Sequence, residues 1–249
     1  MFLSTSCSDR SAIRLFCVPH AGGGPSAFRG WKEQLAPDIE TSLIHLPGRE
    51  GRFREKPYVS LELLVRDLTD AVLSDLADGQ RYAFFGNSLG GLIAFETVHE
   101  IQRRVGYEAT HLFVSATGAP HLPAHLPPMG HLGDQELIGE VSDRYGAIPA
   151  PILEDEEFLA AMLPVLRADI RMLEAYTTRT TRPLSCPITA FGGARDLAVP
   201  VQHIEAWREQ TTSSFTRISL DEDHLYLQSS RDQLTATIRE TLLASACPR

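Results

Sequence analysis

A serine with a glycine two residues away on each side is the first feature of this sequence that could do chemistry. Residues 86–90 read Gly-Asn-Ser-Leu-Gly. A short apolar run, residues 82–85, precedes them, and apolar residues at helical spacing follow. A strand, G-x-S-x-G and a helix together predict a nucleophile elbow, in which small neighbours allow a tight turn that exposes the serine. Ser88 is therefore the candidate nucleophile. The alternative is a glycine-rich helix start that this serine caps.

A serine nucleophile needs a base and an acid that orients the base. His224 follows the alternating apolar run at residues 215–220, and Asp196 follows the run at residues 188–191 and a Gly-Gly turn. The chain order Ser, Asp, His is the order found in α/β-hydrolases. We therefore predict a catalytic triad of Ser88, Asp196 and His224.

Other acids and histidines compete for these roles. Asp221 and Asp223 lie so near the predicted base in the sequence that they would reach its second ring nitrogen only with difficulty. His45 also ends an apolar run, but it precedes the serine and would reverse the order. His203 lies within a helical pattern and His99 on the helix after the elbow, and we expect both to face solvent.

An oxyanion hole requires two backbone N–H donors near the nucleophile. One is expected from Leu89, the residue after the serine, and the other from the loop after the first strand. Residues 19–24 of that loop read Pro-His-Ala-Gly-Gly-Gly, and glycines allow the backbone to approach a substrate closely. We assign the second donor to Ala21, with His20 framing the loop. A plain glycine-rich turn is the alternative.

These residues must be positioned by an alternation of strands and helices. We expect strands at residues 13–18, 41–46, 82–85, 111–116, 188–191 and 215–220. We expect helices at residues 27–35, 60–76, 92–105, 201–209 and 230–243, with Ser60 capping the second. Continuous apolar strands alternating with helices predict an α/β-hydrolase fold, with a mostly parallel central sheet flanked by helices. Sites in such sheets lie at the carboxyl ends of the strands.

The alternation is interrupted at about residues 120–180, where no strand pattern occurs. Asp134 is expected to cap one helix there, and a second apolar helical stretch is expected to start within residues 154–157. Pro164 should kink or split that second helix. We interpret the segment as a helical lid over the carboxyl ends of the strands, with Met162 and Leu166 lining a substrate pocket; ordinary packing is the alternative.

Length, charge and cysteine content set further limits. The 249 residues are expected to form a single domain, residues 1–249, with the lid inserted in it. The net charge of −9 argues against nucleic acid as a partner. No apolar run is long enough for a membrane span, no secretory signal is recognisable, and none of the four cysteines forms a C-x-x-C pair. We expect a cytoplasmic monomer with no metal site.

At this point the sequence resembles the type II thioesterases, the free-standing α/β-hydrolases that serve polyketide synthases and non-ribosomal peptide synthetases. The similarity covers nearly the whole chain in the right order. The segments that carry it are residues 19–23, Trp31, residues 45–50, the elbow, residues 167–169, residues 192–196 and residues 224–227. Family members commonly have His before the nucleophile and Met after it. Asn87 and Leu89 stand there in this chain, and Asn87 is expected to alter the lining of the acyl pocket.

The resemblance implies a substrate and a role. The substrate is an acyl group on the phosphopantetheine arm of an acyl or peptidyl carrier protein, and the role is to remove stalled or wrongly primed acyl groups. No cofactor of the enzyme itself is implied. The candidate substrate-binding residues are His20, Asn87, Met162 and Leu166. A basic loop is a candidate docking site for the carrier protein, with a solvated loop as the alternative; its residues are Arg49, Arg52, Arg54 and Lys56.

Without the resemblance, the residues indicate only a serine hydrolase that acts on an ester, a thioester or an amide. A general carboxylesterase, an acyl-CoA thioesterase and the cyclising thioesterase domain of an assembly line are therefore alternatives. A non-catalytic acyl-binding module on the same fold is an alternative of another class.

Overall fold

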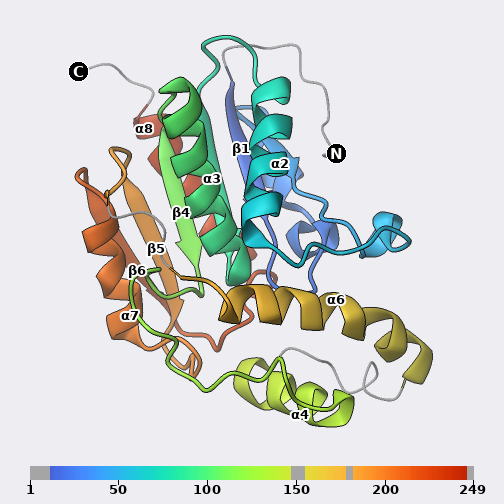
Figure 1. The fold of residues 1–249 in the computed structure, drawn as a ribbon. Coiled ribbons are helices and arrows are strands. Elements are labelled where there is room, and N and C mark those ends of the chain that lie inside the picture. Colours follow the sequence, from blue (N-terminus) through green and yellow to red (C-terminus); the bar gives the residue numbers. More distant parts are fainter. Residues whose placement is uncertain (1–11, 147–154, 178–181, 246–249) are drawn as a thin grey trace.

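Six parallel strands form the centre of the molecule (Figure 1). The computed structural model describes residues 12–146, 155–177 and 182–245. The strands are β1 (Ile13–Val18), β2 (Ile39–Leu43), β3 (Tyr82–Asn87), β4 (His111–Ser115), β5 (Ile188–Gly193) and β6 (Phe215–Leu220). Their order in the sheet is β2-β1-β3-β4-β5-β6, and each neighbouring pair is parallel. The predicted α/β-hydrolase fold with a parallel sheet is confirmed.

The strand order reverses beside β1, and this reversal places the site. The chain moves from β1 outward to β2, then returns to the other side of β1 to form β3. The loops that leave the carboxyl ends of β1 and β3 therefore run in opposite directions, and in sheets of this kind ligands bind at such a reversal. The predicted oxyanion loop follows β1 and the predicted nucleophile follows β3.

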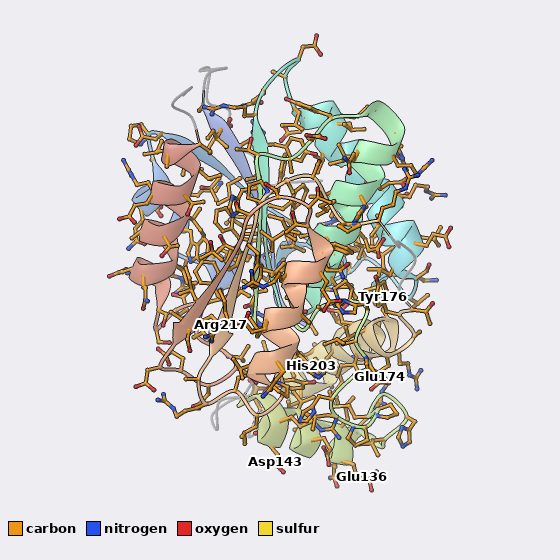
Figure 2. The ribbon with its side chains drawn as sticks, turned by 90° about the vertical axis from the view of Figure 1, so that its left-hand side faces the viewer. Glu136, Asp143, Glu174, Tyr176, His203 and Arg217 are labelled. Carbon is orange, nitrogen blue, oxygen red and sulfur yellow. The ribbon has the colours of Figure 1, made fainter. Side chains whose placement is uncertain are left out.

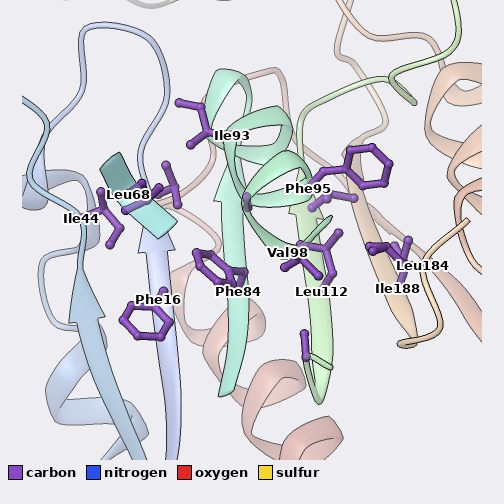
Figure 3. Close-up of a cluster of buried hydrophobic side chains, with 14 of the residues drawn as sticks. Phe16, Ile44, Leu68, Phe84, Ile93, Phe95, Val98, Leu112, Leu184 and Ile188 are labelled. Atoms are coloured by element: carbon purple, nitrogen blue, oxygen red, sulfur yellow. The ribbon is translucent and has the colours of Figure 1, made fainter. Parts of the chain in front are cut away.

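Helices cover both faces of the sheet, as near-continuous apolar strands require. One face packs against α2 (Leu61–Asp75), α3 (Leu89–Val105) and α7 (Val201–Glu205), and the other against α1 (Trp31–Leu35) and α8 (Arg231–Ala244). Figure 3 shows Leu68 of α2 and Val98 of α3 in one buried cluster with Phe16 and Phe84 of the sheet. The N-cap role predicted for Ser60 is confirmed, because its hydroxyl accepts the N–H of Leu63.

A separate layer of helices lies across the carboxyl ends of the strands (Figure 1). We call this the cap layer; it comprises the loop at residues 120–133, α4 (Asp134–Tyr145) and α6 (Glu156–Glu174). Figure 2 shows it from the side, with Glu136 and Asp143 on α4 and Glu174 at the end of α6. Its apolar cluster consists of Met129, Leu137, Val141, Leu166 and Ile170. The described part of residues 120–180 contains no strand; residues 147–154 and 178–181 of the predicted insertion, including the expected helix start at Glu154, lie outside it.

The carboxylate of Glu174 fixes the loop of the cap layer to α6. It accepts the backbone N–H groups of Met129 and Gly130, at 2.5 and 3.0 Å. Arg171 donates back to the carbonyl oxygen of Gly130 at 2.9 Å. A loop rich in proline and glycine therefore gains a defined path from side chains of the helix beneath it.

Several predicted boundaries were wrong. The expected helix at residues 27–35 is a 3-10 turn, Pro25–Phe28, and then α1, because Gly30 lies between them at φ +84°. The strand expected at residues 41–46 is Ile39–Leu43, in register with β1. The helix expected at residues 201–209 is α7 followed by a 3-10 turn, Ala206–Gln210.

The two helices of the cap layer also differ from expectation. Of the kink or split predicted at Pro164, the split does not occur, because α6 runs through 19 residues. Pro164 is exposed, so a carbonyl it leaves unpaired can be hydrated, while the buried Val165 and Leu166 hold the other side of the helix. Asp134 is the first residue of α4 rather than its cap. Gly133 occupies the cap position, and its N–H donates to Glu136.

Candidate active site

Ser88 lies in a strained turn between β3 and α3. Its φ and ψ are 53° and −120°, and its N–H donates to the carbonyl oxygen of Ser115 at 2.7 Å. A Cβ added to Gly86 would lie 2.1 Å from the Gly90 oxygen, and one added to Gly90 would lie 2.2 Å from the Val18 oxygen. Only glycine fits at both positions, as the elbow predicted from the sequence requires.

The structure brings the three predicted triad residues together. The His224 Nε2 atom lies 3.3 Å from Ser88 Oγ, and His224 Nδ1 lies 2.8 Å from Asp196 Oδ2. The side chains of His224 and Asp196 are 4% and 1% exposed. The Asp196 Oδ1 atom accepts the N–H groups of Ala198 and Val199 at 2.8 and 3.1 Å. These bonds orient the carboxylate. It accepts a hydrogen bond from the Nδ1–H group of His224, and the Nε2 lone pair then faces the serine.

The competing acids do not contact this histidine. Arg195 forms ion pairs with the exposed carboxylates of Asp221 and Asp223. The loop that carries them lies against the end of β5, where a Cβ on Gly193 would be only 2.1 Å from the Asp223 oxygen. Arg195 also donates its N–H to the Glu222 oxygen at 2.9 Å. The loop is thus held on β5 with the acids outward.

The competing histidines have other surroundings. His45 is buried, and its Nε2 donates to the Arg49 carbonyl oxygen at 3.0 Å. The expectation that His99 faces solvent was wrong. Its ring packs against Phe95 at 4.5 Å, and burial lowers its pKa to about 4. His203 is half-buried and packs against His125.

The two predicted oxyanion donors follow the carboxyl ends of β1 and β3, which are neighbours in the sheet. Leu89 is the first residue of α3, so its N–H has no acceptor within the helix and lies at the positive end of the helix dipole. Ala21 follows β1 and packs against the cluster of the cap layer. Burial and the nearby His224 and Arg49 lower the pKa of His20 to about 4, so its ring is neutral beside the base.

A buried ion pair between α6 and a distant loop was not predicted. The guanidinium of Arg49 donates to both carboxylate oxygens of Asp169, at 2.7 and 3.1 Å. The side chains are 5% and 1% exposed. Asp169 also accepts the N–H of Gly22 at 2.8 Å, and Arg49 donates to the Gly23 oxygen at 3.3 Å. The pair therefore holds the glycine-rich loop that contains Ala21.

This ion pair removes Arg49 from the predicted basic docking loop. Arg49 is buried against Asp169 and faces inward. Arg52 pairs with Glu55 and donates to the His45 oxygen. Only Arg54 and Lys56 remain exposed, and two cations do not form the expected cluster.

Met162 and Leu166, predicted to line a pocket, are placed on the inner side of the cap layer. Leu166 is 5% exposed, and its Cδ1 atom would lie 3.4 Å from a Cβ on Gly22. Met162 packs on the same cluster, and so does Ala21. These two side chains of α6 therefore belong to an apolar cluster that reaches the predicted oxyanion loop.

Asn87 is not brought to that cluster. It is fully buried at the end of β3. Alternate residues of a strand face the same side, so the Asn87 side chain shares the face of Phe85, which packs against α1 and α8, and not the opposite face of Phe84. Neither amide atom has a hydrogen-bond partner within the described residues.

Two tyrosines at the site were not predicted to be site residues, although one of them, Tyr226, belongs to a segment that carries the family resemblance. The ring of Tyr145, the last residue of α4, lies 4.7 Å from the ring of His224. Burial raises the pKa of Tyr145. Tyr226, two residues after His224, is buried beneath it. Only the proximity of Tyr226 to His224 in the sequence could have drawn attention to it, and nothing local marks Tyr145.

The described residues contain no group of three or more metal-ligating side chains placed to hold an ion. No helix in the described part of the chain combines the length and apolarity needed to cross a membrane.

Comparison with known proteins gives consistent matches along the chain. A family profile described as "Thioesterase domain" matches residues 13–242. Gramicidin S biosynthesis protein GrsT from Aneurinibacillus migulanus is 35% identical over 248 residues, covering 100% of this chain and 96% of GrsT. RedJ, a thioesterase from the prodiginine pathway of Streptomyces coelicolor, is 39% identical, with a TM-score of 0.85 over 94% of this chain and 92% of RedJ. BorB, a type II thioesterase from the borrelidin cluster, is 29% identical, with a TM-score of 0.85 over 97% and 96% of the two chains.

Proposed function

The chain belongs to the type II thioesterases, and we propose from this that it hydrolyses acyl thioesters on the phosphopantetheine arm of acyl or peptidyl carrier proteins. In this proposal Ser88 is the nucleophile, His224 is the base and Asp196 is the acid that orients the base. In this function it removes aberrant or stalled acyl groups from polyketide or non-ribosomal peptide assembly lines. The observation that carries the proposal is the continuous contact from Ser88 Oγ through the His224 ring to Asp196.

The mechanism divides into acylation and hydrolysis. His224 Nε2 takes the hydroxyl proton as Ser88 Oγ attacks the thioester carbonyl carbon. The oxyanion that forms is stabilised by the N–H groups of Ala21 and Leu89. The C–S bond then breaks, and the pantetheine sulfur takes the proton from His224 Nε2 and leaves as the thiol. A thiolate is a better leaving group than an amine, so little protonation is needed at this step.

Hydrolysis returns the enzyme to its starting state. His224 takes a proton from a water molecule, whose oxygen attacks the acyl–Ser88 ester carbonyl. The same two N–H groups stabilise the second oxyanion. The ester bond breaks, Ser88 Oγ recovers the proton from His224, and the carboxylic acid leaves.

The cap layer acts in this proposal as a lid that holds the acyl chain. Leu166 and Met162 from α6 and Tyr145 from α4 share one apolar cluster with Ala21. Tyr145 also contacts the His224 ring. An acyl chain attached to Ser88 would meet these side chains, and their apolar surface suits an aliphatic group.

A comparison of leaving groups tests the substrate class. The same short acyl group is supplied on a carrier protein, on coenzyme A and on p-nitrophenol. We expect kcat/KM for the carrier-bound thioester to exceed that of the p-nitrophenyl ester by about tenfold or more, since remote binding energy assists catalysis. Equal or lower values on the carrier protein would favour a general carboxylesterase, and a preference for coenzyme A would favour an acyl-CoA thioesterase.

A further inference from the structure

The hydroxyl of Tyr226 ties the loop of the base to two strands of the sheet. It accepts a hydrogen bond from Ser115 Oγ at 2.9 Å and donates to the Phe191 carbonyl oxygen at 3.1 Å. Tyr226 is 1% exposed and lies two residues after His224. Ser115 ends β4, and Phe191 lies in β5, the strand that leads to Asp196. One phenol group therefore joins three segments that lead to the active site.

Ser115 is the point at which the nucleophile and the base are joined. Its carbonyl oxygen accepts the N–H of Ser88 at 2.7 Å, while its hydroxyl donates to Tyr226. A short path thus runs from the backbone of Ser88, through both polar groups of Ser115, to the phenol two residues from His224. Tyr226 lies on the face of the sheet that packs against α1 and α8.

The surroundings of this path are apolar, which makes its polar groups unusual. Tyr226 packs in the cluster that fills the space between the sheet, α1 and α8. Asn87 is in register with Ser115 on the neighbouring strand and is also fully buried. Polar groups in such a core cost stability unless they are bonded, and a bonded network fixes one arrangement of its members. A phenylalanine at this position would pack as well without that specificity.

We propose that Tyr226 and Ser115 are positioning residues that set the separation of Ser88 Oγ and His224 Nε2. The inference rests on the proposed function, because it assigns these two residues a role in the same catalytic step. Loss of the phenol hydroxyl removes the bonds that tie the segment after His224 to Ser115 of β4 and Phe191 of β5, while Arg195 still holds the segment before His224 on β5. The His224 ring can then move relative to Ser88 while Asp196 still holds its Nδ1 proton.

The test uses two variants that remove one hydroxyl each and one matched control. Tyr226→Phe and Ser115→Ala remove the two partners of the bond. Tyr82→Phe is the control, because Tyr82 is fully buried and donates to a backbone carbonyl, that of Tyr107, at 3.0 Å. Tyr82 begins β3, at the end of the sheet away from Ser88. The three variants are compared by kcat and KM on an acylated carrier protein, by the rate at which a fluorophosphonate labels Ser88, and by thermal unfolding.

We expect Tyr226→Phe and Ser115→Ala each to lower kcat and the labelling rate about tenfold, with KM within about twofold of wild type, because small displacements of catalytic groups are costly. The double variant should be no slower than Tyr226→Phe alone, since Tyr226→Phe already breaks the bond that Ser115→Ala removes, together with the bond to Phe191. Tyr82→Phe should lower the melting temperature to a similar extent and leave kcat and labelling within about twofold of wild type.

Two results would overturn the inference. One is Tyr226→Phe and Ser115→Ala proteins that are folded and label and turn over within twofold of wild type. The other is an equal loss of activity in Tyr82→Phe, which would assign the effect to stability. The proposed function is tested separately by Ser88→Ala: if that variant is inactive while Tyr226→Phe is normal, only the positioning role fails.

Discussion

The Asp169 carboxylate, in the middle of α6, accepts the backbone N–H of Gly22 at 2.8 Å and pairs with the buried guanidinium of Arg49. Three segments are joined by this carboxylate: the cap layer, the loop after β1 and the loop after β2. The loop after β1 contains Ala21, whose N–H is a proposed oxyanion donor. The helix that covers the site is therefore also a support for the site beneath it.

Replacing Asp169 by Asn should destabilise the fold. It leaves the Arg49 guanidinium buried without a counter-charge, which typically costs about 3–5 kcal/mol. Urea unfolding at neutral pH measures the change. Arg66→Gln is the control, because it breaks the exposed ion pair with Asp67 and should change the free energy of unfolding little. Equal stability of the two variants would show that the buried ion pair contributes no more to the free energy of unfolding than the exposed pair does.

An alanine at Gly86 should prevent the elbow from closing. Its Cβ would lie 2.1 Å from the Gly90 oxygen, so strand and helix must move apart and Ser88 is displaced. We expect failure to fold or at least a hundredfold loss of thioesterase activity. A hundredfold loss corresponds to an increase of about 3 kcal/mol in the activation free energy. Gly139→Ala is the matched control: its Cβ meets nothing within 4 Å, and it should stabilise α4 by up to about 1 kcal/mol. An active Gly86→Ala enzyme would refute the tight turn.

Tyr145 should act through its ring rather than its hydroxyl. The ring packs on His224 and on the cap-layer cluster, whereas no hydrogen bond of the hydroxyl occurs within the described residues. Tyr145→Ala should lower kcat/KM on acyl-carrier substrate about tenfold, the size of a lost aromatic contact of about 1.4 kcal/mol. Tyr145→Phe should remain within about twofold of wild type. The reverse ranking would assign the effect to the hydroxyl.

The stability of the protein should fall in mild acid because of buried histidine. His111 is 6% exposed, and burial lowers its pKa from 6.5 to about 4. Between these pH values the unfolded chain binds the proton and the folded chain does not, so the free energy of unfolding rises with pH. Each such group contributes a slope of up to about 1.4 kcal/mol per pH unit. His111→Gln should reduce the slope between pH 6.5 and 4, measured by urea unfolding at several pH values; an unchanged slope would contradict the assignment.

Much of the site could be predicted from the sequence because its signals are local. Ser88, Asp196 and His224 each follow an apolar run, and parallel strands bring their carboxyl ends to one edge. The glycines around Ser88 mark the turn by themselves. Helix starts were also local, as Ser60 shows.

The remainder depends on contacts between distant segments. Arg49 and Asp169 are 120 positions apart, and nothing near either residue indicates that they pair. Ser115 and Tyr226 are 111 positions apart. A cluster of arginines in a loop suggested an exposed cationic surface, but the burial of one member and the pairing of another removed it. Pairings of this kind follow from tertiary packing, which local pattern does not encode.

The most direct test of the account follows the acyl group from the carrier protein to Ser88. Wild type and Ser88→Ala are each mixed with a stoichiometric amount of carrier protein bearing a short acyl thioester, and both proteins are measured by intact mass over time. The account predicts that wild type removes the acyl group, passing through an enzyme heavier by that group. Ser88→Ala should leave the carrier acylated, with kcat reduced by several powers of ten. Deacylation by Ser88→Ala near the wild-type rate would contradict the assignment of Ser88 as the nucleophile.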